Sequence, residues 1–292
     1  MANVNEQQDN SSEPWTLTIR PGKGNLDLRL RDIWNYRDLI KLFVRRDFVA
    51  IYKQTILGPL WFFIQPVLAS IMYYVLFSRV AGLKTDGIPP ILFYMTGQLS
   101  WMYFSECLLK TSNTFVSNAG LFGKVYFPRL VVPVSVVISN MLRFIVQLLL
   151  LLLVMAYYVY FKDMPLHVTP ALLLLPLLLI IMAGLGLGAG ILISAMTTKY
   201  RDLQFLVSFG TQLLMFTTPV VISVQNLSDG VFKTIVQLNP MTAVVQLFRH
   251  AFFNTGAPEL WQIAYSAGFM VVLLVAGIAV FNRVEKSFMD TV

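Results

Sequence analysis

Apolar residues run in six long stretches along the chain, separated by shorter polar segments. The hydrocarbon core of a bilayer is about 30 Å thick, so a helix that crosses it needs about 20 apolar residues. The stretches that approach or exceed this length are residues 58–78, 91–109, 130–161, 170–196, 203–224 and 260–281. The pattern therefore predicts an all-α integral membrane protein with six transmembrane helices, whose membrane domain comprises residues 58–292.

The third stretch is longer than a single span requires. Its first half carries Ser135, Asn140 and Arg143, which are too polar to face lipid. We expect this half to pack against other helices near the inner membrane surface. The hydrophobic pattern gives no reason for the presence of Arg143.

A helical periodicity precedes the first span, in residues 32–52. The apolar residues that recur on one side of this helix are Ile33, Tyr36, Ile40, Phe43, Val44, Phe48 and Ile51. A basic amphipathic helix directly before a span is expected to lie on the inner leaflet, and a small soluble subdomain is the alternative. Residues 1–57 would then be a cytosolic N-terminal segment, in which residues 1–30 carry no recognisable motif.

Three segments between the spans are more than plain turns. Residues 117–130 carry aromatic side chains on a short loop, which need either a partner surface or the membrane interface. Residues 197–202 form a shorter polar loop on the same side. On the other side, residues 225–258 contain two apolar runs broken at Asn239 and Pro240, which predicts two short helices. Such helices suit re-entrant elements buried against protein, although helices that rest on the outer leaflet fit the pattern nearly as well.

Composition and charge support a membrane protein and give its orientation. Of the 292 residues, 57% are hydrophobic and 13% are charged, and the mean hydropathy is +0.67, whereas soluble domains carry about 25% charged residues. The net charge of +7 would suit nucleic acid, but topology explains it. With cytosolic termini, fifteen Lys and Arg residues lie on the inner side and five on the outer side, as the positive-inside rule requires. We therefore expect no nucleic-acid partner.

The sequence does not indicate catalytic chemistry. Cys107 is the only cysteine, and Glu106 is the only acidic residue inside a predicted span. The sequence contains neither a phosphate loop of the form GxxxxGK[ST] nor a metal-ligand spacing. The glycines of residues 184–190 lie in an apolar span, where small residues four apart let helices approach closely. We therefore predict no enzymatic activity, cofactor or metal ion for this chain. The scarcity of acids also disfavours a membrane-embedded glycosyltransferase.

Uncharged polar and aromatic side chains occur within several spans. Aromatic rings stack on the apolar faces of sugars and amides bind hydroxyl groups, so these residues suit a passage for hydroxylated solutes. Tryptophan and tyrosine also form belts at membrane interfaces, which explains some of them equally well. The candidate channel residues are Trp61, Phe62, Gln65, Tyr73, Gln98, Trp101, Ser208 and Gln212.

Two sequence segments add a family resemblance to this arrangement. Residues 45–67 read RRDFVAIYKQTILGPLWFFIQPV and lead from the amphipathic helix into the first span, and residues 239–242 read NPMT before the last span. From about residue 30 onward the chain resembles the ABC-2 transporter family. Within that family it is most similar to the membrane subunits that export O-antigen, capsular polysaccharide or wall teichoic acid (the Wzm/TarG type).

The resemblance implies a homodimer in the bacterial cytoplasmic (inner) membrane, with two cytosolic ABC ATPase subunits that bind ATP and Mg²⁺. The substrate would be a lipid-linked glycan, moved through a channel that spans one and five line; an ABC-2 exporter of small molecules or drugs is the alternative. Residues 32–52 would be the interface helix. The residues that would contact the ATPase are Leu121, Phe122, Lys124, Tyr126, Arg129, Tyr200, Arg201 and Asp202. The outer gate would include Val236, Leu238, Pro240 and Phe248.

Overall fold

The computed structural model describes residues 30–53, 56–125, 127–165, 168–197, 200 and 202–288, and every regular element in these ranges is a helix. The long helices are α2 (Arg37–Tyr52), α3 (Trp61–Tyr73), α4 (Pro90–Ser112), α7 (Val131–Phe161), α8 (Leu175–Thr197), α9 (Leu203–Phe216), α11 (Pro240–Phe253) and α12 (Leu260–Phe288). The short ones are α1 (Leu30–Asn35), α5 (Thr114–Ser117), α6 (Ala119–Phe122) and α10 (Val231–Leu238). A π-helical segment, Tyr74–Val80, continues α3, and 3-10 turns occur at Gly58–Leu60, Pro170–Leu174 and Val224–Asn226.

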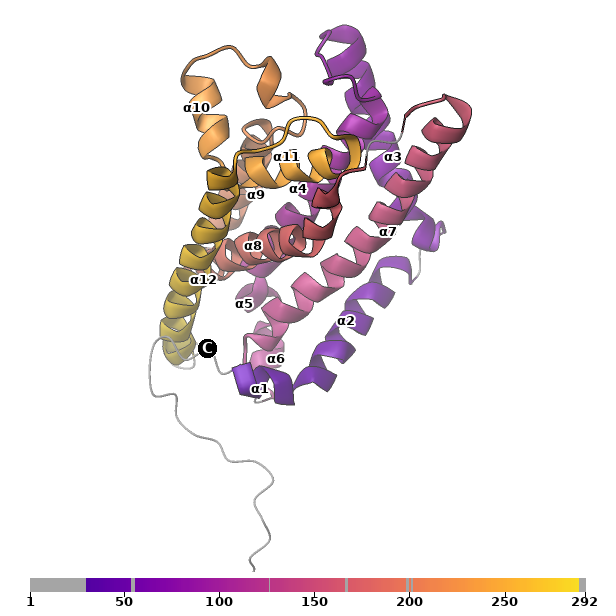
Figure 1. Cartoon of the computed structure of the whole chain (residues 1–292). Coiled ribbons are helices and arrows are strands. Elements are labelled where there is room, and N and C mark those ends of the chain that lie inside the picture. Colours follow the sequence, from indigo (N-terminus) through magenta and orange to yellow (C-terminus); the bar gives the residue numbers. More distant parts are fainter. Residues whose placement is uncertain are drawn as a thin grey trace, which may run out of the picture.

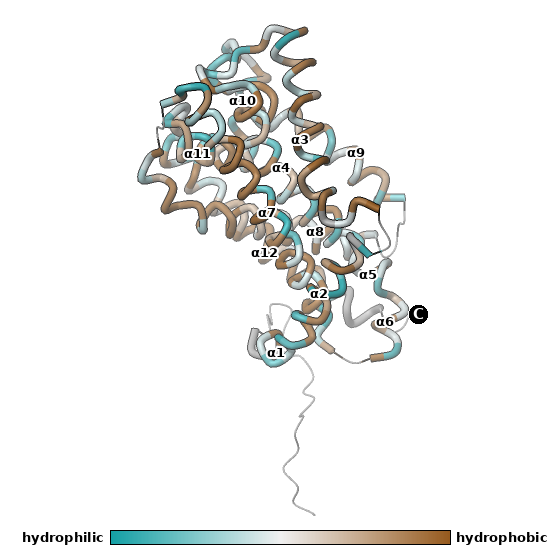
Figure 2. The backbone as a smooth tube through the Cα atoms, turned by 90° about the vertical axis from the view of Figure 1, so that its right-hand side faces the viewer, coloured by the Kyte–Doolittle hydropathy of each residue, from teal (hydrophilic) through white to brown (hydrophobic). Residues whose placement is uncertain are grey.

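The helices form one bundle whose two ends carry different connections. Figure 1 shows α1, α6 and the C-terminal part of α12 at one end, and α10 at the other. The loop predicted on the cytosolic side, residues 117–130, therefore lies at the opposite end from the predicted outer helices. Hydrophobic residues, drawn brown in Figure 2, run along the bundle helices between these two ends.

Four helical stretches are long and apolar enough to cross a membrane: Trp61–Val80, Val131–Phe161, Pro170–Thr197 and Leu260–Arg283. The protein is therefore a multi-pass membrane protein. The two other predicted spans also form helices, but each differs from an ordinary span. α9 has 14 residues, and α4, with 23 residues, contains polar and charged side chains.

The polarity of α4 follows from its place in the middle of the bundle. It packs against α3, α7, α8, α9 and α11, and most of its side chains are buried. The buried hydroxyl groups of this helix bond to its own backbone: Thr96 donates to the Leu92 and Phe93 carbonyls, and Ser100 donates to the Thr96 carbonyl. A helix enclosed by protein needs less hydrophobic surface than one that faces lipid. Hydropathy alone therefore does not identify α4 as a helix that could cross the membrane.

The glycine run of α8 packs this helix between α4 and α12, as the sequence predicts. A methyl group built on Gly186 would lie 2.9 Å from the Phe104 carbonyl oxygen of α4. On the other side, a methyl group on Gly188 would lie 2.8 Å from the backbone of α12. Only glycine allows both helices to approach α8 this closely.

The fifth predicted span ends earlier than its apolar pattern suggests. The pattern continues to residue 224, whereas α9 ends at Phe216 and a turn follows. Pro219 explains this end, because proline cannot donate the next helical hydrogen bond. The Thr218 hydroxyl instead donates to the Leu214 carbonyl at 2.8 Å.

The helix predicted before the first span is present as α2. Figure 1 shows it alongside the half of α7 that lies nearest α1. The first half of α7 is thus covered by protein, as its polarity predicts, and Ser135 and Asn140 are buried. On α2, Phe43 is 4% exposed and meets the loop that follows α6.

Candidate functional site

The predicted channel residues fall into an exposed group and a buried group. Trp61 and Gln65 on α3 are exposed, as are Ser208 and Gln212 on α9. Tyr73 connects these two helices, because its hydroxyl lies 3.6 Å from the Met215 sulfur of α9. The exposed residues therefore lie on the two helices that the family resemblance places along a channel.

The apolar side chains around these residues are also exposed. On α9 the exposed fractions reach 81% for Phe205 and 61% for Phe209. The main contacts of α9 within the chain are with α4 and α8. An uncovered apolar face of this kind suits either lipid or a second protein surface.

Gln98 and Trp101 do not lie on this exposed face. Both are on α4 and buried, since α4 is enclosed by other helices. Gln98 accepts a hydrogen bond of 3.0 Å from the Ser70 hydroxyl of α3, and the Trp101 ring packs against Phe104. In the single chain Gln98 therefore connects α4 to α3, whereas the ring contact of Trp101 lies within α4. Residue type alone did not show that the two side chains are buried.

A small cavity opens beside the exposed face of α3. Its volume is about 120 Å³, and Trp61, Phe62 and Gln65 contribute to its wall. The opposite wall comes from α4 and α7 and includes Tyr103, Glu106 and Arg143. Aromatic rings thus lie next to charged and amide groups, which is a combination that suits polar, hydroxylated ligands.

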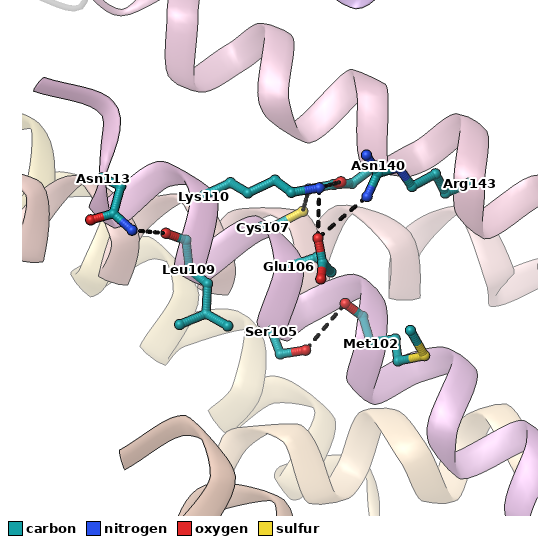
Figure 3. Close-up of polar contacts among 9 residues, drawn as sticks. All are labelled: Met102, Ser105, Glu106, Cys107, Leu109, Lys110, Asn113, Asn140 and Arg143. Carbon is teal, nitrogen blue, oxygen red and sulfur yellow. Dashed lines mark hydrogen bonds and ion pairs between the residues drawn. The ribbon is translucent and has the colours of Figure 1, made fainter. Parts of the chain in front are cut away.

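Glu106 and Arg143, which the sequence left unpaired, meet in the structure (Figure 3). The Glu106 carboxylate lies 2.6 Å from the Lys110 ammonium and 3.4 Å from the Arg143 guanidinium. Asn140 joins the group, because its side-chain oxygen accepts a hydrogen bond of 3.3 Å from Lys110. The arginine of the third span therefore pairs with the acidic residue of the second span. This pairing explains why both are tolerated at this depth.

The aromatic residues of the 117–130 loop are buried against the chain itself. Phe122 and Phe127 are each 5% exposed, and both pack in a cluster with Phe43 of α2 and Phe115 of α5. The expectation that these rings need a separate partner protein or the membrane interface is therefore wrong for both. The apolar face of α2 covers them instead.

The remaining predicted coupling residues differ in exposure. Arg129 is buried, with its guanidinium 5.7 Å from the centre of the Phe122 ring, whereas Leu121 is half-buried. Lys124, Tyr200 and Asp202 are exposed, so another subunit's surface can reach them. Tyr126 and Arg201 lie outside the described residues.

The two outer helices predicted around Asn239 and Pro240 are present. Asn239 ends α10 and caps α11, because its side-chain oxygen accepts a hydrogen bond of 2.9 Å from the Met241 amide. α11 is almost completely buried, with Phe248 at its centre. α10 lies mostly exposed, and of the predicted gate residues Val236 is buried and Leu238 is exposed, while Pro240 is half-buried.

Lys233 and Asp229 form an ion pair at the start of α10. The Lys233 ammonium donates a hydrogen bond of 2.7 Å to the Asp229 carboxylate and lowers the pKa of that carboxyl group. On α2, Lys41 lowers the pKa of Asp38 in the same way at 2.8 Å. Both carboxylates are fully exposed, so these pairs contribute little to stability.

Arg249 has a structural role that charge counting missed. The positive-inside count treated it as an outer-loop charge, whereas its side chain is buried in α11. The guanidinium donates to the carbonyls of Pro219 and Val220, at 2.5 and 2.8 Å, and covers the Phe93 ring at 3.6 Å. Arg249 therefore joins α11 to the turn after α9 and to α4. The only sequence signal was a charged residue within an otherwise apolar helix.

Comparisons with known proteins agree with this architecture. The family described as "ABC-2 type transporter" matches residues 38–253. The chain is 30% identical over 266 residues to an O-antigen export system permease protein, RfbA, of Myxococcus xanthus, covering 90% of this chain and 98% of that protein. It is 27% identical over 257 residues to an RfbA permease of Klebsiella pneumoniae, covering 87% of this chain and 94% of that protein.

Proposed function

The chain belongs to the ABC-2 type transporter family, and on this premise we propose that it is the membrane subunit of an exporter of lipid-linked polysaccharide. The substrate would be a polymer of the O-antigen type, carried across the bacterial cytoplasmic membrane. The observation that carries this proposal is similarity to O-antigen export permeases along nearly the whole length of both proteins. An exporter of small molecules would share the fold, but no observation favours it.

In this proposal the energy comes from two cytosolic ABC ATPase subunits, which bind ATP and Mg²⁺. The sequence of the chain contains no phosphate loop that could bind nucleotide. The exposed residues Lys124, Tyr200 and Asp202 lie in the two loops assigned to the cytosolic side and would meet the ATPase. Both termini would be cytosolic.

Movement of the ATPase would reach the bundle through buried aromatic contacts. Phe122 lies within the proposed docking loop and packs against Phe115 and Phe127. Phe127 in turn meets Phe43 of α2, with 6.0 Å between ring centres. Because these rings are close-packed, a displacement of the loop must also displace α2 and the start of α7.

Two copies of the chain would form the channel between them. The exposed faces of α3 and α9 carry Trp61, Gln65 and Gln212, which would line the passage in the dimer. The outer helices α10 and α11 would close it at the external end. The buried α11 would hold α10 in place, since Asn239 joins both helices.

The proposal is tested in a strain that lacks the gene for this chain. Loss of surface polysaccharide, with lipid-linked polymer accumulating in the cytoplasmic membrane, supports the polymer assignment. Normal surface polysaccharide together with loss of resistance to a toxic small molecule would instead identify a drug exporter. In parallel, affinity purification in mild detergent should recover an ABC ATPase in equimolar amount, and recovery of the chain without one would contradict the coupling scheme.

A further inference from the structure

A polar cleft lies between α2, α4 and α7, and the transport scheme above gives it no role. Its volume is about 640 Å³. The charged side chains that line it are Arg46, Asp47, Glu106, Lys110 and Arg143. The neutral polar side chains are Asn113, Ser117, Asn118, Ser139 and Asn140. The buried polar groups of such a cleft need hydrogen-bond or charge partners.

The charges of the cleft do not balance. Glu106 is shared by two cations, Lys110 at 2.6 Å and Arg143 at 3.4 Å. The only other acidic residue in the lining, Asp47, already pairs with Arg46 at 2.9 Å. One positive charge is therefore uncompensated by the lining. Because Arg143 is 23% exposed and Lys110 38%, this excess charge is only partly screened by water and attracts an anion.

Several polar atoms of the same cleft are buried without a hydrogen-bond partner. They include the Arg143 Nε, the Ser139 hydroxyl and the Asn113 side-chain oxygen. A buried donor without an acceptor is costly, so such atoms are expected to meet water or a ligand. The Arg143 and Ser139 donors suit an anionic oxygen, and the Asn113 oxygen suits a ligand hydroxyl group.

The position of the cleft indicates where such an anion comes from. Lys110 lies in the last turn of α4, at the cytosolic end of the predicted span, and its side chain is 38% exposed. On α2, the side chain of Leu42 is exposed and lies one helical turn from Arg46 of the lining. A positively charged cleft at the membrane interface, with an exposed apolar side chain beside it, matches a lipid, whose phosphate lies at the interface and whose acyl chains lie in the bilayer.

We propose that this cleft binds the phosphate group of an anionic phospholipid of the inner leaflet. Arg143 and Lys110 hold the phosphate oxygens, the Ser139 hydroxyl donates a further hydrogen bond, and Asn113 accepts from a headgroup hydroxyl. Bidentate contact with phosphate is a typical use of arginine. This inference stands independently of which polymer the protein exports.

Native mass spectrometry of the full chain in neutral detergent tests the proposal, with phosphatidylglycerol, phosphatidylcholine and inorganic phosphate as separate probes. Wild-type protein should bind phosphatidylglycerol in preference to phosphatidylcholine, and inorganic phosphate at millimolar concentration should not displace it. Arg143→Gln should weaken phosphatidylglycerol binding about tenfold, the value of one charged hydrogen bond. Glu106 keeps Lys110 as its partner in this variant, so no carboxylate is left unpaired.

Two further variants separate binding from structure. Lys41→Gln removes the same charge from an exposed position on α2 outside the cleft and should leave binding unchanged. Glu106→Gln removes the competing carboxylate and should strengthen binding several-fold. An equal loss of phosphatidylglycerol binding in Lys41→Gln and Arg143→Gln would contradict the proposed site. Weaker binding in Glu106→Gln would also contradict it. Binding of inorganic phosphate without selectivity for phosphatidylglycerol would overturn the lipid assignment.

Discussion

The rings of Phe115 and Phe281 stack with their centres 4.7 Å apart and 24° between their planes. Phe115 belongs to α5, beside the loop assigned to ATPase docking, and Phe281 lies in the last helix of the bundle. Both are completely buried. The proposed docking region is thus part of the same packed cluster as α2, α7 and α12, and it cannot move without them.

The coupling scheme predicts different defects for buried and exposed residues of the docking loop. Lys124→Ala combined with Val125→Ala should weaken association with the ATPase, because both side chains are exposed, while the stability of the chain stays unchanged. Phe122→Ala should lower the free energy of unfolding by about 3 kcal/mol through the cavity it leaves. Copurification and thermal unfolding of the same samples measure the two effects. The scheme would be contradicted if the two variants lost the same amount of copurified ATPase and the same free energy of unfolding.

The close approach of α4 and α8 predicts a strict size limit at Gly186. Gly186→Ala should lower the free energy of unfolding by about 1–3 kcal/mol, because the added methyl group collides with the Phe104 carbonyl. Gly268→Ala on α12 is the matched control, since nothing lies within 4 Å of the added methyl group. That substitution should be neutral or stabilising by up to about 1 kcal/mol. If α4 and α8 were not in contact, thermal unfolding in detergent would show Gly186→Ala to be as neutral as Gly268→Ala.

Arg249 should be essential for the fold of the outer half. Arg249→Met leaves the carbonyls of Pro219 and Val220 buried without their donor, so the free energy of unfolding should fall by about 2 kcal/mol or more. Arg79→Met removes an exposed arginine and should cost less than about 0.5 kcal/mol. Limited proteolysis should detect the loosening at residues 217–230 in the first variant alone. Full protection there would show that the guanidinium is dispensable.

The channel assignment predicts a separation between transport and assembly. Gln65→Leu and Gln212→Leu should reduce polymer export several-fold, because the leucines cannot bind the hydroxyl groups of the passing sugars. The amount of assembled complex should stay the same. Gln225→Leu makes the same change at an exposed position in the outer loop and should not affect export. A parallel loss of export and complex would mean that Gln65 and Gln212 only pack the dimer.

Much of the architecture could be predicted from the sequence, because its causes are local. Apolar runs of spanning length predict the helices, and Asn239 followed by Pro240 marks the break between α10 and α11. The glycine spacing likewise predicts the close approach of α8 to its neighbours. Each of these features depends on residues near one another in the chain.

The features that the sequence analysis missed depend on contacts between distant segments. Glu106 and Arg143 are 37 residues apart, so residue type alone could not show that they pair. The aromatic residues of the docking loop were predicted to be exposed, because no residue near them in the sequence indicates that Phe43 of α2 helps to cover them. Arg249 was counted only as a charge of the outer segments for the same reason, although three backbone carbonyls surround it.

Reconstitution into proteoliposomes tests the central claim most directly. The chain would be compared with and without its copurified ATPase, and translocation of lipid-linked polymer would be followed through its exposure to an external glycosidase. The account predicts no ATP hydrolysis and no polymer movement by the chain alone, and ATP-dependent movement once the ATPase is present. Polymer movement driven by ATP in liposomes that contain only this chain would contradict it.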